Sequence, residues 1–406
     1  MPEQNAPGFG ATVRQLRNQR GWSLRDLAER IRFNRGYIGK VEQGEKFPDR
    51  QFAELSERAF SANGELLAIW QVEAEARQRV EKVGRLLTAS VEDSVRLIAS
   101  IEERLSLGEI DVAMRHLAVA YLGTPPAPML METVALRSQV LRRLRDHNYR
   151  PHELADLYVM LGRIQGVLAY AALDLGDADG AMTHATAAWR CAEHAGDNEL
   201  HAWVRGTQSL IARFQGDYAH ALGFVEDGLH YPSSGTSRIR LLCGVAQCHA
   251  NLGNSPGTNK ALDLSWIERE KGTTPDPVAG LFEFSRAKQH YYAGSSLIWL
   301  PNEADATRAT QETTEAIDIW QREPSGSRSL DDEALAHIYL GTAQLRLGNL
   351  ASAGAAIRPI LELPPERQIS WIKKRLMRLA HMLRSGRYAD STDARSLHDE
   401  IHAIAA

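Results

Sequence analysis

The chain has 406 residues, of which 44% are hydrophobic and 24% charged, a balance typical of globular material with room for more than one domain. Its net charge of −4 excludes a protein that is basic throughout. The charge is unevenly spread, because residues 1–50 carry about +4 and the remainder carries about −8. A basic head on an acidic body is the distribution expected when one part of a chain binds nucleic acid.

Several classes of protein are disfavoured by what the sequence lacks. Its three cysteines, Cys191, Cys243 and Cys248, form no C-x-x-C pair, which favours a reducing cytoplasm and argues against a zinc site. No signal peptide precedes the first predicted helix, and no apolar run approaches the roughly 20 residues that span a bilayer. No nucleophile-elbow, Walker-type or dinucleotide-binding loop occurs. We therefore expect a cytoplasmic protein that is not an enzyme, with no membrane association, no metal and no cofactor.

The first elements in chain order lie in the basic head. Residues 1–8 are polar with two prolines and are predicted to be disordered. A helix is expected over 10–19, and the stretch 23–44 then predicts two short helices joined by a tight turn. Ser23 and Asn34 are each placed to cap one of these helices, because their side-chain oxygens can accept a backbone N–H.

The two short helices are predicted to pack through apolar stripes, formed by Leu24, Leu27, Ala28 and Ile31 on the first and by Ile38 and Val41 on the second. The other side of the second helix carries small, polar and basic residues: Asn34, Arg35, Gly36, Gly39, Lys40 and Gln43. Such an exposed face suits the DNA major groove, which admits one α-helix.

From Leu27 to Gly44 the chain reads L-A-E-R-I-R-F-N-R-G-Y-I-G-K-V-E-Q-G. This stretch resembles the helix-turn-helix of the Xre/Cro family of bacterial regulators, in which L-A-x-x-x-G-V-S-x-x-Y-[IL]-S-x-[IV]-E-x-G is usual. Arg32 stands where the turn glycine is usual, so it needs an αR, bridge or mildly strained backbone. Asn34 and Gly39 stand where the family has serines.

The resemblance implies a five-helix DNA-binding domain over 9–72 that contacts a double-stranded DNA operator. After the motif, helices are expected over 50–60 and 64–76. The DNA-contact residues that the resemblance assigns are Arg17, Ser23, Leu24, Asn34, Arg35, Gly36, Tyr37, Lys40 and Lys46. Arg35 is the best candidate for bidentate recognition of guanine, although any single charge could also be an ordinary solvated one. Because two glycines lie on the reading face, phosphate contacts and DNA shape are expected to carry more of the specificity.

Residues 73–84 are predicted to form a connector helix, and 85–406 a domain of helical repeats. In that domain a phrase recurs, in which a leucine-rich helix is followed by Gly and, five residues later, by Ala. It occurs at Gly108, Gly176, Gly216 and Gly348, with weaker copies at Gly253 and Gly294. The numbers of residues between successive glycines of this series fit a helical repeat of about 34 residues with insertions.

A small residue stands seven positions before each of the five later glycines: Ala169, Ser209, Ala246, Ala287 and Gly341. A small residue there lets the two helices of a hairpin approach closely, which resembles the tetratricopeptide repeat. The predicted fold class is therefore all-α, with an Xre/Cro-type helix-turn-helix domain followed by an α-solenoid of tetratricopeptide-like hairpins.

The first helix of each hairpin is expected to line the concave surface of the solenoid. The ligand-contact residues predicted there are Arg163, Tyr170, Asp174, Trp203, Arg213, Arg240, Gln247, Asn251, Lys288 and Tyr291. Cations, amides and aromatics along one groove suit an extended peptide. A small-molecule effector would differ only in pocket shape, and an ordinary solvated surface is the alternative.

The combination resembles the bacterial peptide-sensing regulators that join such a head to tetratricopeptide repeats. We therefore expect a sequence-specific DNA-binding transcriptional regulator whose repeats bind a peptide or small-molecule effector, mediate dimerisation, or both. A homodimer is expected because one head buries too little surface for tight binding. The alternative is a protein-interaction adaptor with a weak or non-specific DNA-binding head, which Gly36 and Gly39 make conceivable.

Overall fold

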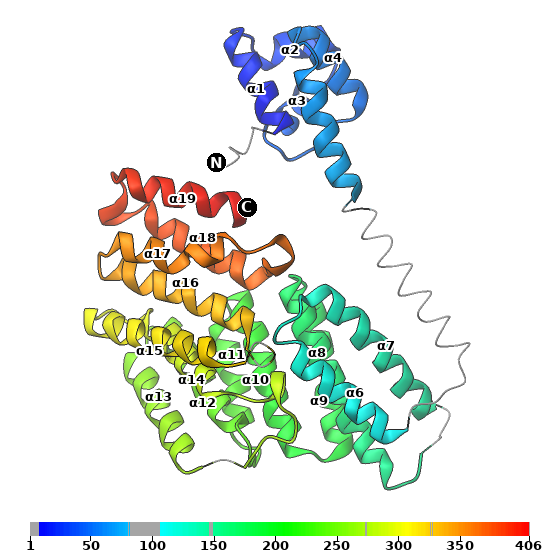
Figure 1. Ribbon diagram of the computed structural model, residues 1–406, viewed down its shortest axis with the longest axis vertical. Coiled ribbons are helices and arrows are strands. Elements are labelled where there is room, and N and C mark those ends of the chain that lie inside the picture. The colour runs from blue at the N-terminus through cyan, green and yellow to red at the C-terminus, as the bar shows by residue number, and fades with distance from the viewer. Residues whose placement is uncertain are drawn as a thin grey trace. The chain divides into compact units, whose positions relative to one another are not determined.

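The computed structural model describes residues 8–79, 81, 106–145, 149–272, 274–324, 326 and 328–405. Every regular element among these residues is helical, so the predicted all-α class is confirmed (Figure 1). The chain divides into two compact units, Met1–Arg96 and Leu97–Ala406. Three predictions fall at least partly outside the described residues. These are the disorder over 1–8, the end of the connector helix at 84 and the start of the repeat domain at 85.

The N-terminal unit contains α1 (Phe9–Gln19), α2 (Leu24–Ile31), α3 (Arg35–Glu42), α4 (Arg50–Phe60) and a further helix over 65–79. Both predicted caps are present. The Ser23 hydroxyl accepts the Asp26 N–H at 3.2 Å, while the Asp26 carboxylate accepts the Ser23 N–H at 2.7 Å. The Asn34 side-chain oxygen accepts the Gly36 N–H at 2.7 Å. These caps set where α2 and α3 begin, and hence which residues α3 exposes.

The turn between α2 and α3 is made by Arg32, whose φ of 57° and ψ of 43° are left-handed. This is the mildly strained option among those expected, and it costs about 1–2 kcal/mol for a residue with a Cβ. The strain is offset by the core on either side of the turn. Its fully buried side chains include Leu27, Ile31, Ile38, Val41 and Phe52.

The helix over 65–79 belongs to the N-terminal unit beyond residue 72, where the domain was expected to end. The Glu73 carboxylate accepts the Phe9 N–H at 2.6 Å, and the Arg77 guanidinium lies 4.6 Å from the centroid of the Phe47 ring. Phe47 in turn stacks on Trp70, whose indole N–H donates to a backbone carbonyl at 2.9 Å. This helix therefore closes one side of the core.

The second unit is a stack of helical hairpins, which Figure 1 shows in chain order. Their helices are α6 (Leu107–Ala120), α7 (Pro126–Arg145), α8 (Glu153–Asp174), α9 (Ala178–Ala195), α10 (Asn198–Gln215), α11 (Tyr218–Gly228), α12 (Ser237–Asn251), α13 (Ser255–Glu270), α14 (Arg286–Leu297), α15 (Glu303–Arg322), α16 (Leu330–Arg346), α17 (Leu350–Leu361), α18 (Ser370–Leu383) and α19 (Thr392–Ala405). Short 3-10 turns lie at η1 (Gly280–Phe282), η2 (Pro365–Arg367) and η3 (Gly386–Tyr388). The predicted solenoid of hairpins is thus confirmed.

Four of the predicted repeat glycines turn the chain between the two helices of a hairpin. Their φ angles are positive, between 77° and 95°, a region that residues with a Cβ rarely adopt: Gly176, Gly216, Gly253 and Gly348. The prediction was wrong for Gly108 and Gly294, which lie inside α6 and α14. At Gly294 an added Cβ would lie 2.4 Å from the Thr313 methyl carbon, so that glycine serves helix contact rather than a turn.

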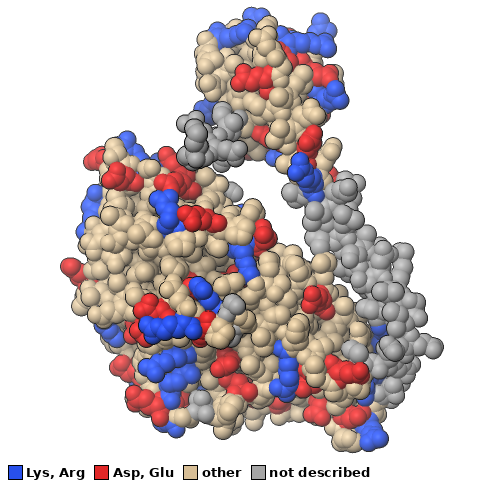
Figure 2. Space-filling view, in the orientation of Figure 1, with Lys and Arg blue, Asp and Glu red and all other residues tan. Residues whose placement is uncertain are grey.

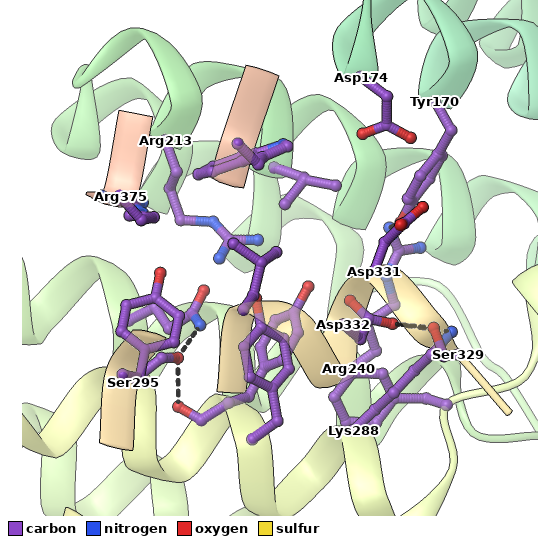
Figure 3. A pocket seen from close by; sticks show the side chains of 18 of the residues that line it. Tyr170, Asp174, Arg213, Arg240, Lys288, Ser295, Ser329, Asp331, Asp332 and Arg375 are labelled. Atoms are coloured by element: carbon purple, nitrogen blue, oxygen red, sulfur yellow. Dashed lines mark hydrogen bonds and ion pairs between the residues drawn. The ribbon is translucent and has the colours of Figure 1, made fainter. Parts of the chain in front are cut away.

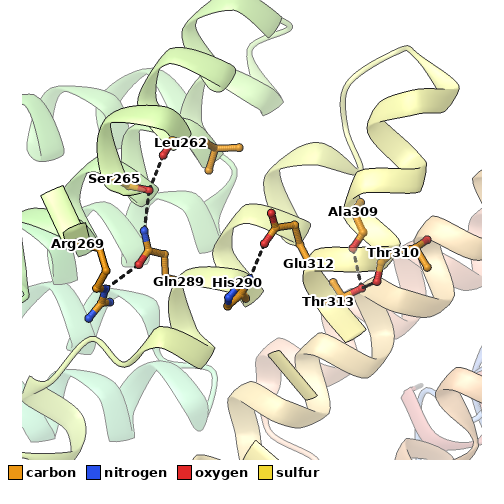
Figure 4. A network of polar contacts seen from close by, with 9 residues as sticks. All are labelled: Leu262, Ser265, Arg269, Gln289, His290, Ala309, Thr310, Glu312 and Thr313. Carbon is orange, nitrogen blue, oxygen red and sulfur yellow. Dashed lines mark hydrogen bonds and ion pairs between the residues drawn. The ribbon is translucent and has the colours of Figure 1, made fainter. Parts of the chain in front are cut away.

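The expected close approach of paired helices is also observed. All five small residues that precede the glycines are buried, and at Gly341 a Cβ would lie 2.7 Å from a methyl carbon of Ile357. Polar contacts fix neighbouring hairpins as well (Figure 4). Gln289, fully buried on α14, donates to the Ser265 hydroxyl at 3.0 Å and accepts from Arg269 at 2.8 Å, both on α13.

Contacts between distant hairpins close part of the concave surface. The connection from α6 to α7 reaches the later repeats, since Leu122 O accepts the Leu330 N–H at 3.0 Å and Gly123 O accepts from the Arg367 guanidinium. The segment between α13 and α14 crosses to α6, where Pro277 O accepts from Arg115 at 2.5 Å. These contacts join the first hairpin to elements far along the chain.

Candidate DNA-binding surface and ligand pocket

The exposed face of α3 carries the residues expected to meet a DNA groove. Asn34, Arg35, Gly36 and Lys40 are exposed, whereas Gly39 is half-buried. An added Cβ at Gly36 would lie 3.1 Å from the capping oxygen of Asn34, so the glycine leaves room for the cap. Figure 2 shows basic side chains at several points on the surface of the N-terminal unit. The face of α3 is therefore positively charged and has little side-chain bulk near its start.

Arg17 differs from the other predicted contacts because its guanidinium is held within the unit. Two of its nitrogens donate to the two oxygens of Glu42, at 2.6 and 2.8 Å, and a third donates to Trp22 O at 2.8 Å. The side chains of Arg17 and Glu42 are only 13% and 4% exposed. The hydrogen bond from Arg17 to Glu42 is the main reason why the pKa of Arg17 is raised. This pair joins α1 to the end of α3.

Tyr37 and Lys46 sit together beside the core. The Lys46 ammonium lies 4.9 Å from the centroid of the Tyr37 ring, which in turn packs 5.5 Å from the Phe52 ring. Burial raises the pKa of the Tyr37 hydroxyl. Ser23 is exposed but uses its hydroxyl as the α2 cap, and Leu24 is half-buried against the core. Lys46 is thus the exposed charge of this group.

The second unit encloses a hollow of about 1030 Å³, counted out to its solvent-open mouth (Figure 3). Its lining comes mainly from the first helices of successive hairpins, α8, α10, α12, α14, α16 and α18. The connection after α6 and the segment before α14 complete it, through Tyr121, Leu122, Leu281, Glu283 and Phe284. The concave face predicted from the repeat pattern is therefore the wall of one pocket.

Three aspartates gather on one side of this pocket (Figure 3). Asp174 is 8% exposed and accepts a hydrogen bond from the Tyr121 hydroxyl. Burial, together with the charge of Asp331, raises the pKa of Asp174 well above its usual range. Burial also raises the pKa of Asp331 to about 6, against the opposing effect of the Arg367 guanidinium 3.6 Å away. These carboxyl groups are under-compensated by cations.

Asp332 completes the acidic side and has closer partners. The Ser329 hydroxyl donates to its carboxylate at 2.7 Å, and the Lys288 ammonium lies 3.7 Å away. The Lys288 side chain is 12% exposed, so its contact with Asp332 is shielded from bulk water. Asp332 therefore has both a hydroxyl and an ammonium group as partners, whereas Asp174 has a hydroxyl alone and Asp331 has the Arg367 guanidinium at 3.6 Å.

Two arginines occupy the other side of the pocket in Figure 3, away from the aspartates. Arg213 is 6% exposed, its guanidinium carbon lies 5.5 Å from the centroid of the Tyr292 ring, and its Nε donates to Ser209 O at 3.4 Å. The guanidinium carbon of Arg375 lies 4.9 Å from the Trp371 ring, and its Nε is buried without a hydrogen-bond partner. No carboxylate among the described residues forms an ion pair with either arginine. The groups that hold these two charges are neutral, and cation–π contacts are prominent among them.

Residues 9–69 match a family model described as a helix-turn-helix domain. This part of the chain is a helix-turn-helix domain. The chain is also similar to the crystal structure of Bacillus thuringiensis PlcR in complex with the peptide PapR7 and DNA, at 12% identity, over 98% of this chain and 99% of that chain, with a TM-score of 0.26. None of the curated proteins matches this chain in sequence.

The sequence predicts ten ligand-contact residues in the repeat domain. Eight of them line the pocket: Tyr170, Asp174, Arg213, Arg240, Gln247, Asn251, Lys288 and Tyr291. Arg240 has a structural part as well, because its guanidinium donates to Trp203 O and to the Tyr170 hydroxyl, both at 2.8 Å. Gln247 donates to the Ser295 hydroxyl. The repeat pattern thus brings these side chains to one space, and their contact with a ligand stays a prediction.

Arg163 and Trp203 do not line the main pocket, which corrects their predicted placement. They border a separate small recess with Asp276 and Phe282, and Trp203 is only 3% exposed. Its ring packs 4.5 Å from that of Phe282, in the segment before α14. That crossing segment covers their part of the concave face, which the repeat pattern could not reveal.

Several pocket residues were missed by the sequence analysis: Tyr121, Tyr218, Tyr292, Ser295, Ser329, Asp331, Asp332, Leu335, Tyr339, Trp371 and Arg375. Leu335 could have been found, because it lies thirteen residues before Gly348, as Arg240 does before Gly253. Gly386 follows α18 with a positive φ of 57°, but Ser391 stands where the repeat pattern has Ala, so the pattern held no signal for Trp371 or Arg375.

Neither a metal site nor a membrane span is found among the described residues. Their His, Cys, Asp and Glu side chains form no group of three or more that could hold a metal ion. Among the same residues, no helix is both long enough and apolar enough to cross a membrane.

Proposed function

We propose that the chain is a sequence-specific DNA-binding transcriptional regulator whose helical repeats bind an effector. The observation that carries the proposal is the helix-turn-helix domain with a capped α3 whose exposed face bears Arg35 and Lys40. A helix of this kind fits the major groove, where arginine can donate two hydrogen bonds to guanine. The positive charge of this helix face attracts DNA of any sequence.

The proposed DNA contacts follow from which groups are exposed and from the bonds that each already makes within the N-terminal unit. Asn34, Arg35, Gly36 and Lys40 meet the groove, and the exposed Lys46 meets a phosphate. Ser23 and Leu24 begin α2, so the proposed contact there is the backbone N–H group at the start of that helix. Arg17 is left out, because Glu42 occupies its guanidinium, and Tyr37 contributes by packing under Lys46.

A genomic binding selection with the full chain tests this function. We expect one enriched motif, and Arg35→Ala should weaken binding to it by about 1–3 kcal/mol while relaxing specificity at one position. Lys46→Ala should weaken binding to all sequences and lower the salt dependence by about one phosphate contact.

A control variant removes the same charge elsewhere on the unit. Arg58 and Arg79 are exposed and lie outside α3, so Arg58→Ala with Arg79→Ala should leave the motif unchanged. No enriched motif, or full binding by the variant with both Arg35→Ala and Lys40→Ala, would contradict the proposal. Weak, salt-sensitive binding that is independent of sequence would favour the adaptor instead.

The effector part of the proposal rests on the pocket of the repeat unit. A ligand there changes DNA binding only if it binds two arrangements of the protein with different affinity. We propose that the active species is a homodimer, because one helix-turn-helix head buries too little DNA surface for tight binding. Analytical ultracentrifugation with and without operator DNA checks this, and a one-to-one complex at a single half-site would contradict it.

A further inference from the structure

Contacts between hairpins far apart in the chain close the pocket on two sides, while its mouth stays open to solvent. On one side, Leu330 and Arg367 bond to the carbonyls of Leu122 and Gly123. On the other, the rings of Phe214 and Trp371 meet edge to face at 4.9 Å. An extended peptide adds about 3.3 Å per residue and needs a groove that is open along its length. The closure therefore favours a compact ligand over an extended one.

The pocket has two chemically different sides. Asp174, Asp331 and Asp332 lie on one side, together with Arg240 and Lys288, and Arg213 and Arg375 lie on the other (Figure 3). Aromatic rings line the pocket as well, among them Tyr291, Tyr339 and Trp371, of which the last two lie against the Arg375 guanidinium. The Tyr291 and Tyr339 rings are 5.8 Å apart and both are buried.

Lys288 pairs with Asp332 and Arg367 with Asp331, whereas Asp174 and Arg213 form no ion pair among the described residues. Asp174 has only the neutral Tyr121 hydroxyl as a hydrogen-bond partner among the described residues, and it is nine-tenths buried. Arg213, buried to the same degree, faces the neutral ring of Tyr292. A buried charge is costly unless a partner of opposite sign meets it. A ligand with an opposite charge at each end would supply both missing partners.

We propose that the effector is a compact zwitterion, whose ammonium group lies against the aspartates and whose carboxylate lies against Arg213 and Arg375. An apolar or aromatic side group would pack on Tyr291, Tyr339 and Trp371, which line the same pocket. This inference rests on the proposed function only in taking the pocket as the effector site. Free amino acids and very short peptides share this chemistry.

Isothermal titration calorimetry on the full chain tests the proposal with defined probes. The probes are phenylalanine, tyrosine, tryptophan and leucine, their homodipeptides and a heptaleucine peptide. Each compact probe is also used as its N-acetyl form and as its carboxamide. We expect at least one free form to bind, with acetylation and amidation each weakening that probe at least tenfold. The preferred length distinguishes amino acids from dipeptides.

Variants assign each end of the ligand to its side of the pocket. Arg213→Met should remove the preference for the free carboxylate over the amide while leaving the cost of acetylation. Asp174→Asn should do the reverse, because Asp174 is the aspartate without a cationic partner in the described part of the chain. Arg190→Met on α9 and Asp318→Asn on α15 change exposed charges outside the pocket and should change neither preference. If Arg213→Met does not fold, Arg375→Met, at a half-buried position, measures the same end.

Three results would overturn the proposal: capped probes that bind as tightly as free ones, a heptapeptide that binds more tightly than every compact probe, or no binding by any probe. DNA binding is measured on the same preparations. If DNA selection yields a motif but the probes do not bind, the zwitterion is wrong and the regulator stands. If the probes bind but no motif is found, the regulator is wrong and the ligand class stands.

Discussion

Replacing Asp331 by asparagine should stabilise the protein without ligand, and increasingly so as the pH rises. The buried carboxyl has a pKa of about 6 in place of its ordinary 3.8. Because the folded state raises this pKa, the folded protein binds more protons than the unfolded chain between these values. Stability contributed by this group is therefore present in full below pH 4 and lost as the pH rises through 6.

The size of the effect follows from the shift. A difference of about two pKa units corresponds to about 3 kcal/mol, at about 1.4 kcal/mol per unit. An asparagine side chain cannot ionise, so we expect Asp331→Asn to match the wild type at about pH 4 and to exceed its free energy of unfolding by up to about 3 kcal/mol at about pH 7.5. The amide oxygen of the asparagine can still accept from Arg367, which limits the loss of that contact.

Urea unfolding of the full chain at four pH values between about 4.5 and 7.5, monitored by tryptophan fluorescence and circular dichroism, measures this difference. Asp318→Asn, on the exposed surface of α15, is the matched control and should give a difference that does not change with pH. A variant that is less stable than the wild type at the highest pH, or a difference that is flat in pH, would refute the reasoning. Either result would mean that Asp331 serves the fold in its charged form.

Three further predictions concern the helix-turn-helix domain. Gly10→Ala should abolish DNA binding and unfold the N-terminal unit at lower temperature, because the new Cβ would lie 2.0 Å from Val41 O, and an unchanged melting curve would contradict this. Glu42→Ala should cost about 3–5 kcal/mol by leaving the Arg17 guanidinium buried without its partner, as urea unfolding would measure. Gly39→Ala should stabilise α3 by about 0.5–1 kcal/mol and keep DNA binding, since its Cβ meets only ordinary contact at 4.0 Å; a gel-shift titration checks the second part.

Local features of both units were predictable because they depend on neighbours in the chain. Ser23 and Asn34 cap helices through N–H groups two or three residues away, and the sequence shows both partners at once. Gly216 and Gly253 end the first helices of their hairpins for the same kind of reason. Recurring offsets of 2 or 3, 6 and 13 residues before the glycines then placed most of the predicted concave residues on one wall.

The error at Gly294 shows the limit of that argument. A glycine inside a helix and a glycine at a turn look alike in sequence, and only the contact with Thr313 on the next helix separates them. The same limit applies to charge at Arg17. Its basic character is visible in the sequence, but its pairing with Glu42, twenty-five residues away, is decided by how α1 packs on α3.

The sequence by itself determined the helix-turn-helix, the repeat period and the faces that the first helices of the hairpins turn inward, since each follows from spacing along the chain. Only the tertiary structure decided that the groove becomes one pocket, with three aspartates on one side and Arg213 and Arg375 on the other. This arrangement depends on the hydrogen bonds from Leu330 to Leu122 and from Arg367 to Gly123, and on the packing of Arg375 against Trp371. Each hairpin is rotated slightly against the one before it, and these rotations add up along the stack. Whether distant hairpins come into contact depends on that sum, so no local pattern encodes these contacts.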